Sequence, residues 1–324
     1  MTTIEGLRRL SLCANFSPEA LLELSEFCQL RRFASGTWLL RQGEVAQAAY
    51  AILSGRVAVL RSLPGGGELP LAEVGPGGLV GELGLLADLH WISSTRALSE
   101  VGTLVFDRTV LLAGYRLGRP VVRDLLWAVL QGICAQLRKL TGELQQVLPP
   151  AAPWSPAPLM PEPAFDYARF LPLLPSAPAW GPAGLQTLAA RGVARTYAAG
   201  EVVFAATSSA AGVALVVRGA VETVALAGAP TVALQVFGPG ALCGVPAVLD
   251  HGQQGVEFRA REGSLLLALA QSEFDSAWVA RDDFAASLHM AVAEQLADSV
   301  LRLVNRLAQQ VGLQRAQANL GHAH

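Results

Sequence analysis

The segment Val80–Leu86 has the residue types of a turn that binds a phosphate. An apolar, strand-like run leads into Gly81-Glu82, a short apolar turn follows, and a second strand-like run begins near Trp91. A turn of this kind directs several backbone N–H groups at one point, which suits a bound phosphate group. Burying the fixed charge of a phosphate also needs a paired cation or several such donors, and arginine serves best because its fork matches two phosphate oxygens.

The same residues resemble the ligand turn of the cyclic nucleotide-binding domain, the module of bacterial catabolite activator proteins and of protein kinase A regulatory subunits. In that family a Gly-Glu-Leu turn holds the ribose through its Glu, and an arginine further on holds the cyclic phosphate. The resemblance places Glu82 at the ribose position. The phosphate arginine falls on Trp91, or on Ile92 in members whose turn is one residue longer. The candidate ligand-binding residues of the first half are Gly81, Glu82, Leu83, Trp91, Ile92 and Ser93.

Two of these candidates have two interpretations each. Glu82 either contacts a ribose or is a turn carboxylate bonded to backbone N–H groups, and the second is favoured because no neighbouring cation offsets its repulsion of a phosphate. Trp91 either stacks on a base or fills an empty pocket, and filling is the commoner fate of a tryptophan inside a β-sandwich.

The second half has a more divergent copy of this turn. Cys243-Gly244-Val245-Pro246 replaces the Gly-Glu-Leu turn, and Gln254-Gly255 stands where the resemblance expects the phosphate arginine and its small neighbour. Valine accepts no hydrogen bond from a hydroxyl group, and proline removes one N–H from the turn. A glutamine offers one neutral hydrogen bond, weaker than a charged pair by about 1 kcal/mol. The weaker candidates here are Gly244, Gln254 and Gly255.

An internal repeat relates the two halves of the chain. Gly219 lies 164 residues after Gly55, and Arg259 lies 163 residues after Arg96, with further glycine, proline and apolar positions in the same register. One deleted residue in a turn accounts for the change of offset. The repeat predicts two similar domains rather than two unrelated ones.

Each half begins with a short helix and continues as short apolar runs separated by glycine or proline. The expected helices cover about 18–28 and 183–191, and the expected strands of the first half cover 38–42, 50–53, 57–60, 69–74 and 104–106. Closely spaced short strands of this kind predict a β-sandwich or jelly roll. Positive φ is expected at Gly55 and Gly219, between two such strands.

After each β region the apolar period changes to that of a helix. Apolar residues recur at alternating spacings of four and three over 126–147 and again over 296–311. Such a heptad seam favours pairing between helices, although a helix packed on its own β domain also needs an apolar stripe. The expected helix interface comprises Leu130, Ile133, Leu137, Leu140, Leu144, Leu296, Val300, Leu303 and Leu307.

A proline-rich stretch separates the halves. No helix or central strand tolerates its proline density, so it predicts an extended linker. The expected domains are 1–148 and 166–324, with the linker at 149–165.

Composition and motifs exclude several classes of function. The net charge of −2 implies no general attraction to nucleic acid or to anionic membranes. The N-terminus lacks a signal-peptide pattern, no apolar run is long enough to span a membrane, and four scattered cysteines indicate reduced thiols, so a cytoplasmic location is expected. The histidines lack metal-ligand spacing, and no nucleophile elbow, P-loop or zinc-protease motif occurs, so neither a metal nor an enzyme is expected.

These observations predict an α+β protein, mainly β, with two cyclic nucleotide-binding-like sandwich or jelly-roll domains that each continue into a long C-terminal helix. The favoured function is a non-enzymatic regulatory or scaffolding protein with degenerate phosphate pockets, no cofactor and a protein partner. The alternative is a sensor that binds cAMP, cGMP or a cyclic dinucleotide through Gly81, Glu82 and Ser93 and shifts its helices. Only residues 312–324 follow the second seam, so no helix-turn-helix domain is expected. A homodimer through the helices is favoured over pairing of the two helices within one chain, because it covers more apolar area.

Overall fold

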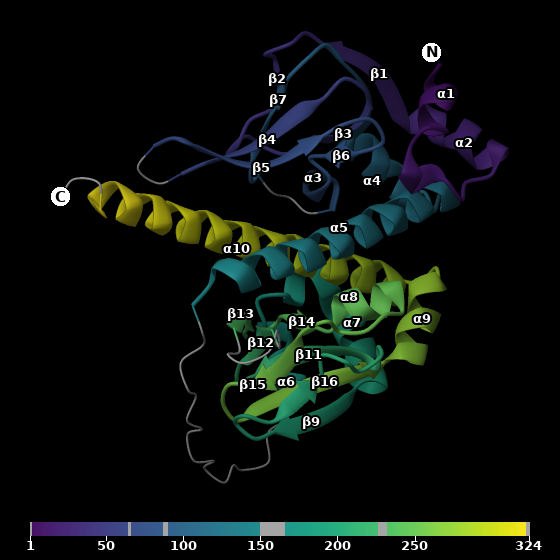
Figure 1. Cartoon of the computed structure of the whole chain (residues 1–324). Coiled ribbons are helices and arrows are strands. Elements are labelled where there is room, and N and C mark those ends of the chain that lie inside the picture. The colour runs from purple at the N-terminus through teal and green to yellow at the C-terminus, as the bar shows by residue number, and fades with distance from the viewer. Residues whose placement is uncertain (1, 64–65, 87–89, 150–165, 226–231, 322–324) are drawn as a thin grey trace. The chain divides into compact units, whose positions relative to one another are not determined.

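The computed structural model describes residues 2–63, 66–86, 90–149, 166–225 and 232–321 (Figure 1), with side chains as far as residue 314. Contacts divide the chain into two compact units. One comprises Met1–Gly132 with Asn305–His324, and the other comprises Ile133–Val304. Apart from Pro149, the expected linker 149–165 lies outside the described residues, and the domain boundaries remain predictions.

Two four-stranded antiparallel sheets form the sandwich of the first unit. Their strand orders are β1-β8-β3-β6 and β2-β7-β4-β5. The strands are β1 (Cys28–Phe33), β2 (Trp38–Leu40), β3 (Ala48–Ser54), β4 (Val57–Ser62), β5 (Glu68–Val74), β6 (Leu79–Val80), β7 (Ser94–Ala97) and β8 (Val101–Asp107).

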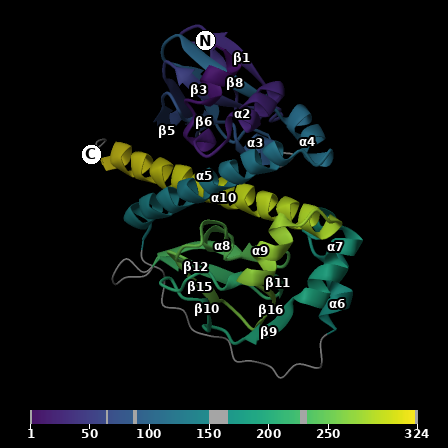
Figure 2. The same cartoon turned by 90° about the vertical axis from the view of Figure 1, so that its right-hand side faces the viewer.

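The second unit repeats this topology strand for strand. Its sheets have the orders β9-β16-β11-β14 and β10-β15-β12-β13 (Figure 2). The strands are β9 (Val193–Tyr197), β10 (Val202–Phe204), β11 (Gly212–Arg218), β12 (Val221–Ala225), β13 (Val232–Phe237), β14 (Leu242–Cys243), β15 (Glu257–Ala260) and β16 (Ser264–Ala270). The predicted fold class, two jelly-roll-like domains with helices, is therefore confirmed.

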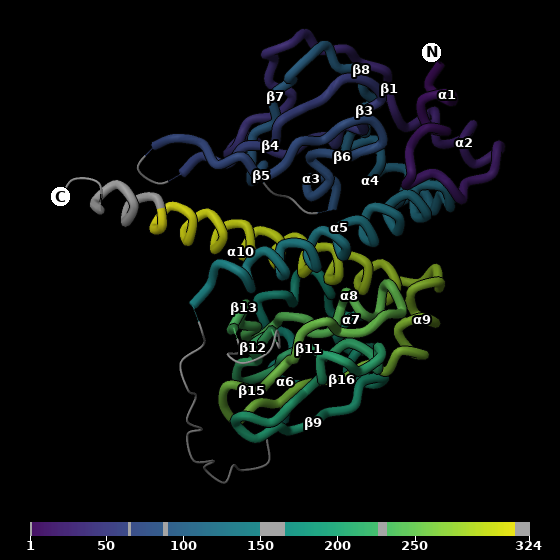
Figure 3. The backbone as a smooth tube through the Cα atoms, in the orientation of Figure 1, coloured from purple at the N-terminus to yellow at the C-terminus, as the bar shows by residue number. Residues whose placement is uncertain are grey.

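Helices flank both sandwiches. The short ones are α1 (Thr3–Leu7), η1 (Ser11–Cys13), α2 (Pro18–Leu24), η2 (Ser25–Phe27), α3 (Leu83–Leu86), α4 (Arg108–Arg116), α6 (Tyr167–Phe170), η3 (Leu171–Leu173), α7 (Ala177–Arg191), α8 (Val245–Asp250) and α9 (Gln271–Val279). The long ones are α5 (Pro120–Val147), a continuous coil in the backbone trace (Figure 3), and α10 (Asp283–Gly321). The heptad seams thus lie on helices, as the periodicity predicts.

The inner faces of the sheets supply the core of each unit. In the first unit Ile52, Val57 and Val101 have no exposed area, because alternate residues of their strands face inward. Strand β1 is not among the predicted strands, because its residues after Cys28 are mostly exposed and show no apolar alternation. The same reason hides β9, in which four of five residues are exposed.

The glycine turns between strands have the backbone that the repeat predicts. Gly55 has φ of 79° and Gly219 has φ of 84°. A Cβ atom on Gly55 would lie 2.1 Å from the carbonyl oxygen of Glu100, so this position needs glycine both for its backbone conformation and for space.

We expect Gly55→Ala to lower the free energy of unfolding far more than Gly36→Ala. Gly36 has φ of 82° but nothing within 4 Å of its virtual Cβ, so its substitution costs only the left-handed backbone, about 1–2 kcal/mol. Urea unfolding of both variants measures the difference. Equal losses would show that the approach of Glu100 does not constrain the turn.

Candidate functional site

The ligand turn of the first half lies between β6 and α3. Gly81, with φ of 78°, connects them, and a Cβ atom there would lie 3.0 Å from the carbonyl oxygen of Ala48 and 3.4 Å from Nε1 of Trp91. Leu83, the first residue of α3, is buried. The backbone of Gly81 thus lies close to Ala48 and to the indole of Trp91, and this turn therefore requires a residue without a side chain.

Glu82 is a partly buried carboxyl group in this turn. Burial raises the pKa of Glu82, and a hydrogen bond with its own backbone N–H acts in the opposite direction. The ribose role of Glu82 remains a prediction.

Trp91 is packed against the core of the first sandwich, beside a cluster that includes Leu40, Val80 and Ala97. Its backbone is tied to the loop before β3, because its N–H donates to the carbonyl oxygen of Glu44 at 2.8 Å. Its Nε1 is buried and has no hydrogen-bond partner among the described residues. The indole therefore packs as a hydrophobic group on the core, and its role toward a ligand remains a prediction.

An arginine that sequence reasoning missed lies beside the first turn. Arg61, near the end of β4, donates one hydrogen bond to the carbonyl oxygen of Ile92 and another to Oδ1 of Asn305 on α10. Ile92 and Ser93 are themselves half-buried. Burial lowers the pKa of the Arg61 guanidinium. The sequence signal for Arg61 is weak, a single cation at the end of an apolar strand.

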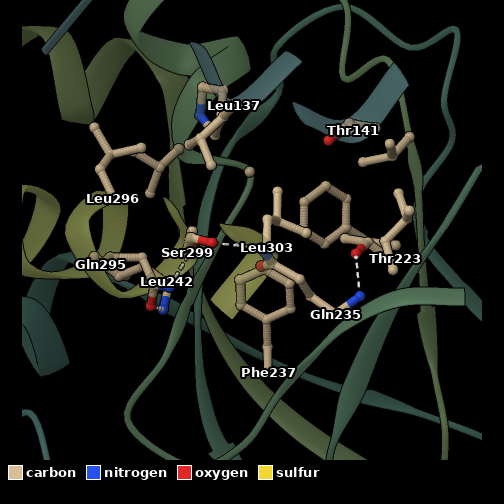
Figure 4. A pocket seen from close by; sticks show the side chains of 16 residues that line it. Leu137, Thr141, Thr223, Gln235, Phe237, Leu242, Gln295, Leu296, Ser299 and Leu303 are labelled. Carbon is tan, nitrogen blue, oxygen red and sulfur yellow. Dashed lines mark hydrogen bonds between the residues drawn. The ribbon is translucent and has the colours of Figure 1, made fainter. Parts of the chain in front are cut away.

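A small cavity occupies the corresponding place in the second unit (Figure 4). Its volume is about 60 Å³, and the lining includes Gly244, Val245 and Pro246 from the turn, Phe237 and Phe258 from the sheet, and Leu137, Leu296 and Leu303 from the two long helices. That volume holds a few water molecules, whereas pockets for small ligands usually measure about 300–1,000 Å³.

Four polar side chains around this cavity, those of Thr223, Gln235, Gln295 and Ser299, take part in hydrogen bonds with one another or with the backbone (Figure 4). Gln295 accepts from the N–H of Leu242 at 2.7 Å and donates to Oγ of Ser299 at 3.1 Å. Gln235 donates to the carbonyl oxygen of Ser299 at 2.9 Å, and its N–H donates to Oγ1 of Thr223 at 3.1 Å. The helix α10 is therefore attached to the turn and the sheet by the protein's own groups.

The loop at the second phosphate position also uses its donors internally. The N–H of Gln254 donates to the carbonyl oxygen of Ser208 at 3.2 Å, and that of Gly255 donates to Ala206 at 2.9 Å. The Gln254 side chain is 5% exposed, and its Nε2 has no partner in the described part of the chain. Gly244, with φ of 86°, precedes α8 in the left-handed conformation that glycine permits.

Most of the predicted helix-interface residues are buried within the single chain. Leu130, Ile133, Leu137, Leu140, Leu144, Leu296, Val300 and Leu303 are all less than 9% exposed, and Leu307 is half-buried. In the second unit, Leu137 of α5 lines the same cavity as Leu296 and Leu303 of α10. Part of each seam thus meets the other within one chain, the arrangement that the sequence analysis kept as its alternative to a homodimer.

Two further features of the described residues bear on function. Among the described residues, no group of three or more histidine, cysteine, aspartate or glutamate side chains is arranged to hold a metal ion. No helix in the described ranges has both the length and the apolar character needed to cross a membrane.

Comparison with known proteins gives a family match in both halves. The family model for the cyclic nucleotide-binding domain matches residues 30–115 and 194–279. The chain is 37% identical to the cyclic AMP receptor protein of Thermus thermophilus over 115 residues, which are 35% of this chain and 52% of that protein. It is 28% identical to a CRP-like cAMP-activated global transcriptional regulator of Mycobacterium tuberculosis over 144 residues, 44% of this chain and 62% of that protein. The matches therefore span about half to three fifths of these relatives.

A solved structure similar to much of the chain is the regulatory domain of Toxoplasma gondii PKA with cAMP. Its sequence identity is 16% and its TM-score 0.33, with 85% of this chain and 90% of that chain covered.

We expect Glu82→Gln to stabilise the protein at neutral pH. The pKa of Glu82 is higher in the folded state than in the unfolded state. Between these two pKa values the folded state therefore binds more protons, so the free energy of unfolding falls as pH rises through that range. The increase in the free energy of unfolding caused by Glu82→Gln should be largest above the pKa of Glu82 in the folded state. It should shrink as the pH falls toward the ordinary pKa of glutamate. Urea unfolding across this range measures it.

Glu68→Gln, at an exposed position of β5, is the matched control for the same chemical change at the protein surface. Destabilisation by Glu82→Gln at neutral pH would show that the Glu82 carboxylate makes a stabilising ionic contact instead.

Proposed function

The chain belongs to the cyclic nucleotide-binding domain family, and from that membership we propose that it is a non-enzymatic, cytoplasmic regulatory protein whose two pockets do not accept a simple cyclic monophosphate. The observation that carries the proposal is the residue at each phosphate position, Trp91 in the first half and Gln254 in the second. Neither is a cation, and a buried phosphate needs one or a set of free N–H donors.

The surroundings of both positions support this proposal. Trp91 packs on core residues where a ligand would need room. The cavity beside the turn Gly244–Pro246 is small, and Gln235, Gln295 and Ser299 in its lining are bonded to groups of the protein itself. A protein whose ligand positions are filled by its own groups acts through its surface and helices, so we propose that it works by binding a protein partner.

The second candidate is a sensor of cAMP, cGMP or a cyclic dinucleotide. The Gly81-Glu82-Leu83 turn of the first half favours it, because the family holds the ribose there. The two relatives described above are named for reception of, or activation by, cAMP. The two candidates differ in whether a cyclic nucleotide binds at physiological salt.

We expect cAMP and cGMP to bind weakly or not at all in calorimetric titration. Loss of one charge-assisted contact to the phosphate is worth about 1.5–3 kcal/mol, and both halves lack it. A sub-micromolar dissociation constant for either nucleotide would overturn the proposal in favour of the sensor.

Trp91→Arg supplies the converse test in the same titration. It should raise the affinity of the first half for cAMP, whereas Trp91→Gln, which opens similar space without a charge, should not. Equal effects of the two variants would mean that space, rather than the cation, limits binding.

For the assembly we propose an intrachain pair of the long helices, which makes the protein a pseudo-dimer. Leu137 and Leu140 are 6% and 8% exposed in one chain, so a homodimer through these residues would have to unpack them first. Light scattering at micromolar concentration should give the mass of a single chain. The homodimer that the sequence favours would be correct if the unmodified protein had the mass of a dimer and if substitution of Leu137 and Leu140 by glutamate lowered that mass to a single chain.

A further inference from the structure

The loop at the second phosphate position is held by an arginine from the first long helix. Arg138 of α5 donates to Oδ2 of Asp250 from Nη2 at 2.7 Å and from Nε at 3.1 Å. It also donates to the carbonyl oxygen of Gln253 at 3.0 Å and to that of Gln254 at 3.4 Å. One guanidinium thus bonds to a carboxylate and two consecutive backbone carbonyls of a single loop.

These contacts reverse the polarity of a phosphate-binding loop. A phosphate loop turns backbone N–H groups toward its ligand. Here the N–H groups of Gln254 and Gly255 are bonded to the segment 206–208, and the loop turns carbonyl oxygens and a carboxylate toward a cation instead.

A glycine in the loop is matched to the arginine. Gly255 has φ of 74°, and a Cβ atom there would lie 2.9 Å from Nη1 of Arg138. The absence of a side chain therefore leaves room for the guanidinium to approach the backbone.

The first unit also contains an arginine between the corresponding loop and a long helix, although this arginine lies on strand β4 rather than on the helix. Arg61 donates to the carbonyl oxygen of Ile92, at the first phosphate position, and to Asn305 of α10. In each unit, therefore, a guanidinium connects the ligand loop to the long helix that comes from the other half of the repeat. In the second unit, the four hydrogen bonds of Arg138 to three residues of one loop distinguish it from a single surface ion pair.

We propose that Arg138 is a tethered substitute for a ligand, which holds α5 and the loop Asp250–Gly255 together without any small molecule. The inference extends the proposed function, because a pocket that has no cyclic nucleotide needs another group to join loop and helix. The loop binds a guanidinium group, and Arg138 of α5 supplies that group.

The reactivity of a buried thiol can report whether the contact between Arg138 and the loop Asp250–Gly255 is formed. Cys134 lies one helical turn before Arg138 and is 1% exposed, and burial raises the pKa of its thiol to about 12. A buried thiol reacts with an external reagent only when its surroundings open. The other cysteines, Cys13, Cys28 and Cys243, are also buried and serve as internal references in the same sample.

The test is pulsed thiol labelling of the full chain without nucleotide, with each cysteine followed by mass spectrometry. Because Arg138→Ala removes hydrogen bonds between a charged group and the loop, and both side chains of the ion pair are partly exposed, this change should speed labelling of Cys134 roughly tenfold. Lys139→Ala, the adjacent exposed cation on α5, should leave the rate unchanged. Asp250→Asn should raise it less than Arg138→Ala, and added guanidinium chloride at low millimolar concentration should slow labelling of Arg138→Ala.

Unchanged labelling of Cys134 in both Arg138→Ala and Asp250→Asn would overturn the inference. An equal rise at Cys134 and Cys243 without rescue by guanidinium would also overturn it, because Arg138 would then stabilise the whole unit rather than this contact. Neither result depends on calorimetry with nucleotides, so the proposed function and the tethered arginine fail separately.

Discussion

A buried phosphate must be matched by a cation or by converging N–H donors, and this constraint governs both halves of the molecule. The first half has an indole at the position of the cation, and the second has a neutral amide. The donors that remain are bonded within the protein, to Ser208 and Ala206 in the second half. These residues are the basis of our proposal that the chain keeps the fold of a nucleotide-binding module without its charge complementarity to a phosphate.

We propose that side chains make the connections that a ligand would otherwise make. Gln295 attaches α10 to the backbone of Leu242, and Arg138 attaches α5 to the loop at Asp250. In a module that responds to a ligand, the ligand must bind one arrangement of loop and helix better than the other. Here Gln295 and Arg138 already make contacts that stabilise one arrangement of loop and helix. This favours our proposal that the arrangement is fixed and that the protein acts by binding other proteins.

Much of the fold was predictable because it depends on local patterns. The repeat, the short strands and the positive φ at Gly55 and Gly219 follow from glycine placement and apolar alternation. The strands β1 and β9 were not predictable, because their exposed residues give no alternation. The arginine contacts were also out of reach: Arg138 and Asp250 are 112 residues apart, and no pattern in sequence couples them. A heptad seam predicts a helix that pairs, but it does not say whether its partner lies in the same chain.

Hydrogen exchange of the loop Asp250–Gly255 and of residues 133–147 of α5, measured with and without saturating cAMP, tests the central claim most directly. If the protein's own groups hold loop and helix together, both segments are protected without ligand and cAMP leaves their exchange unchanged. Fast exchange of both segments in the free protein, slowed by cAMP, would contradict that account.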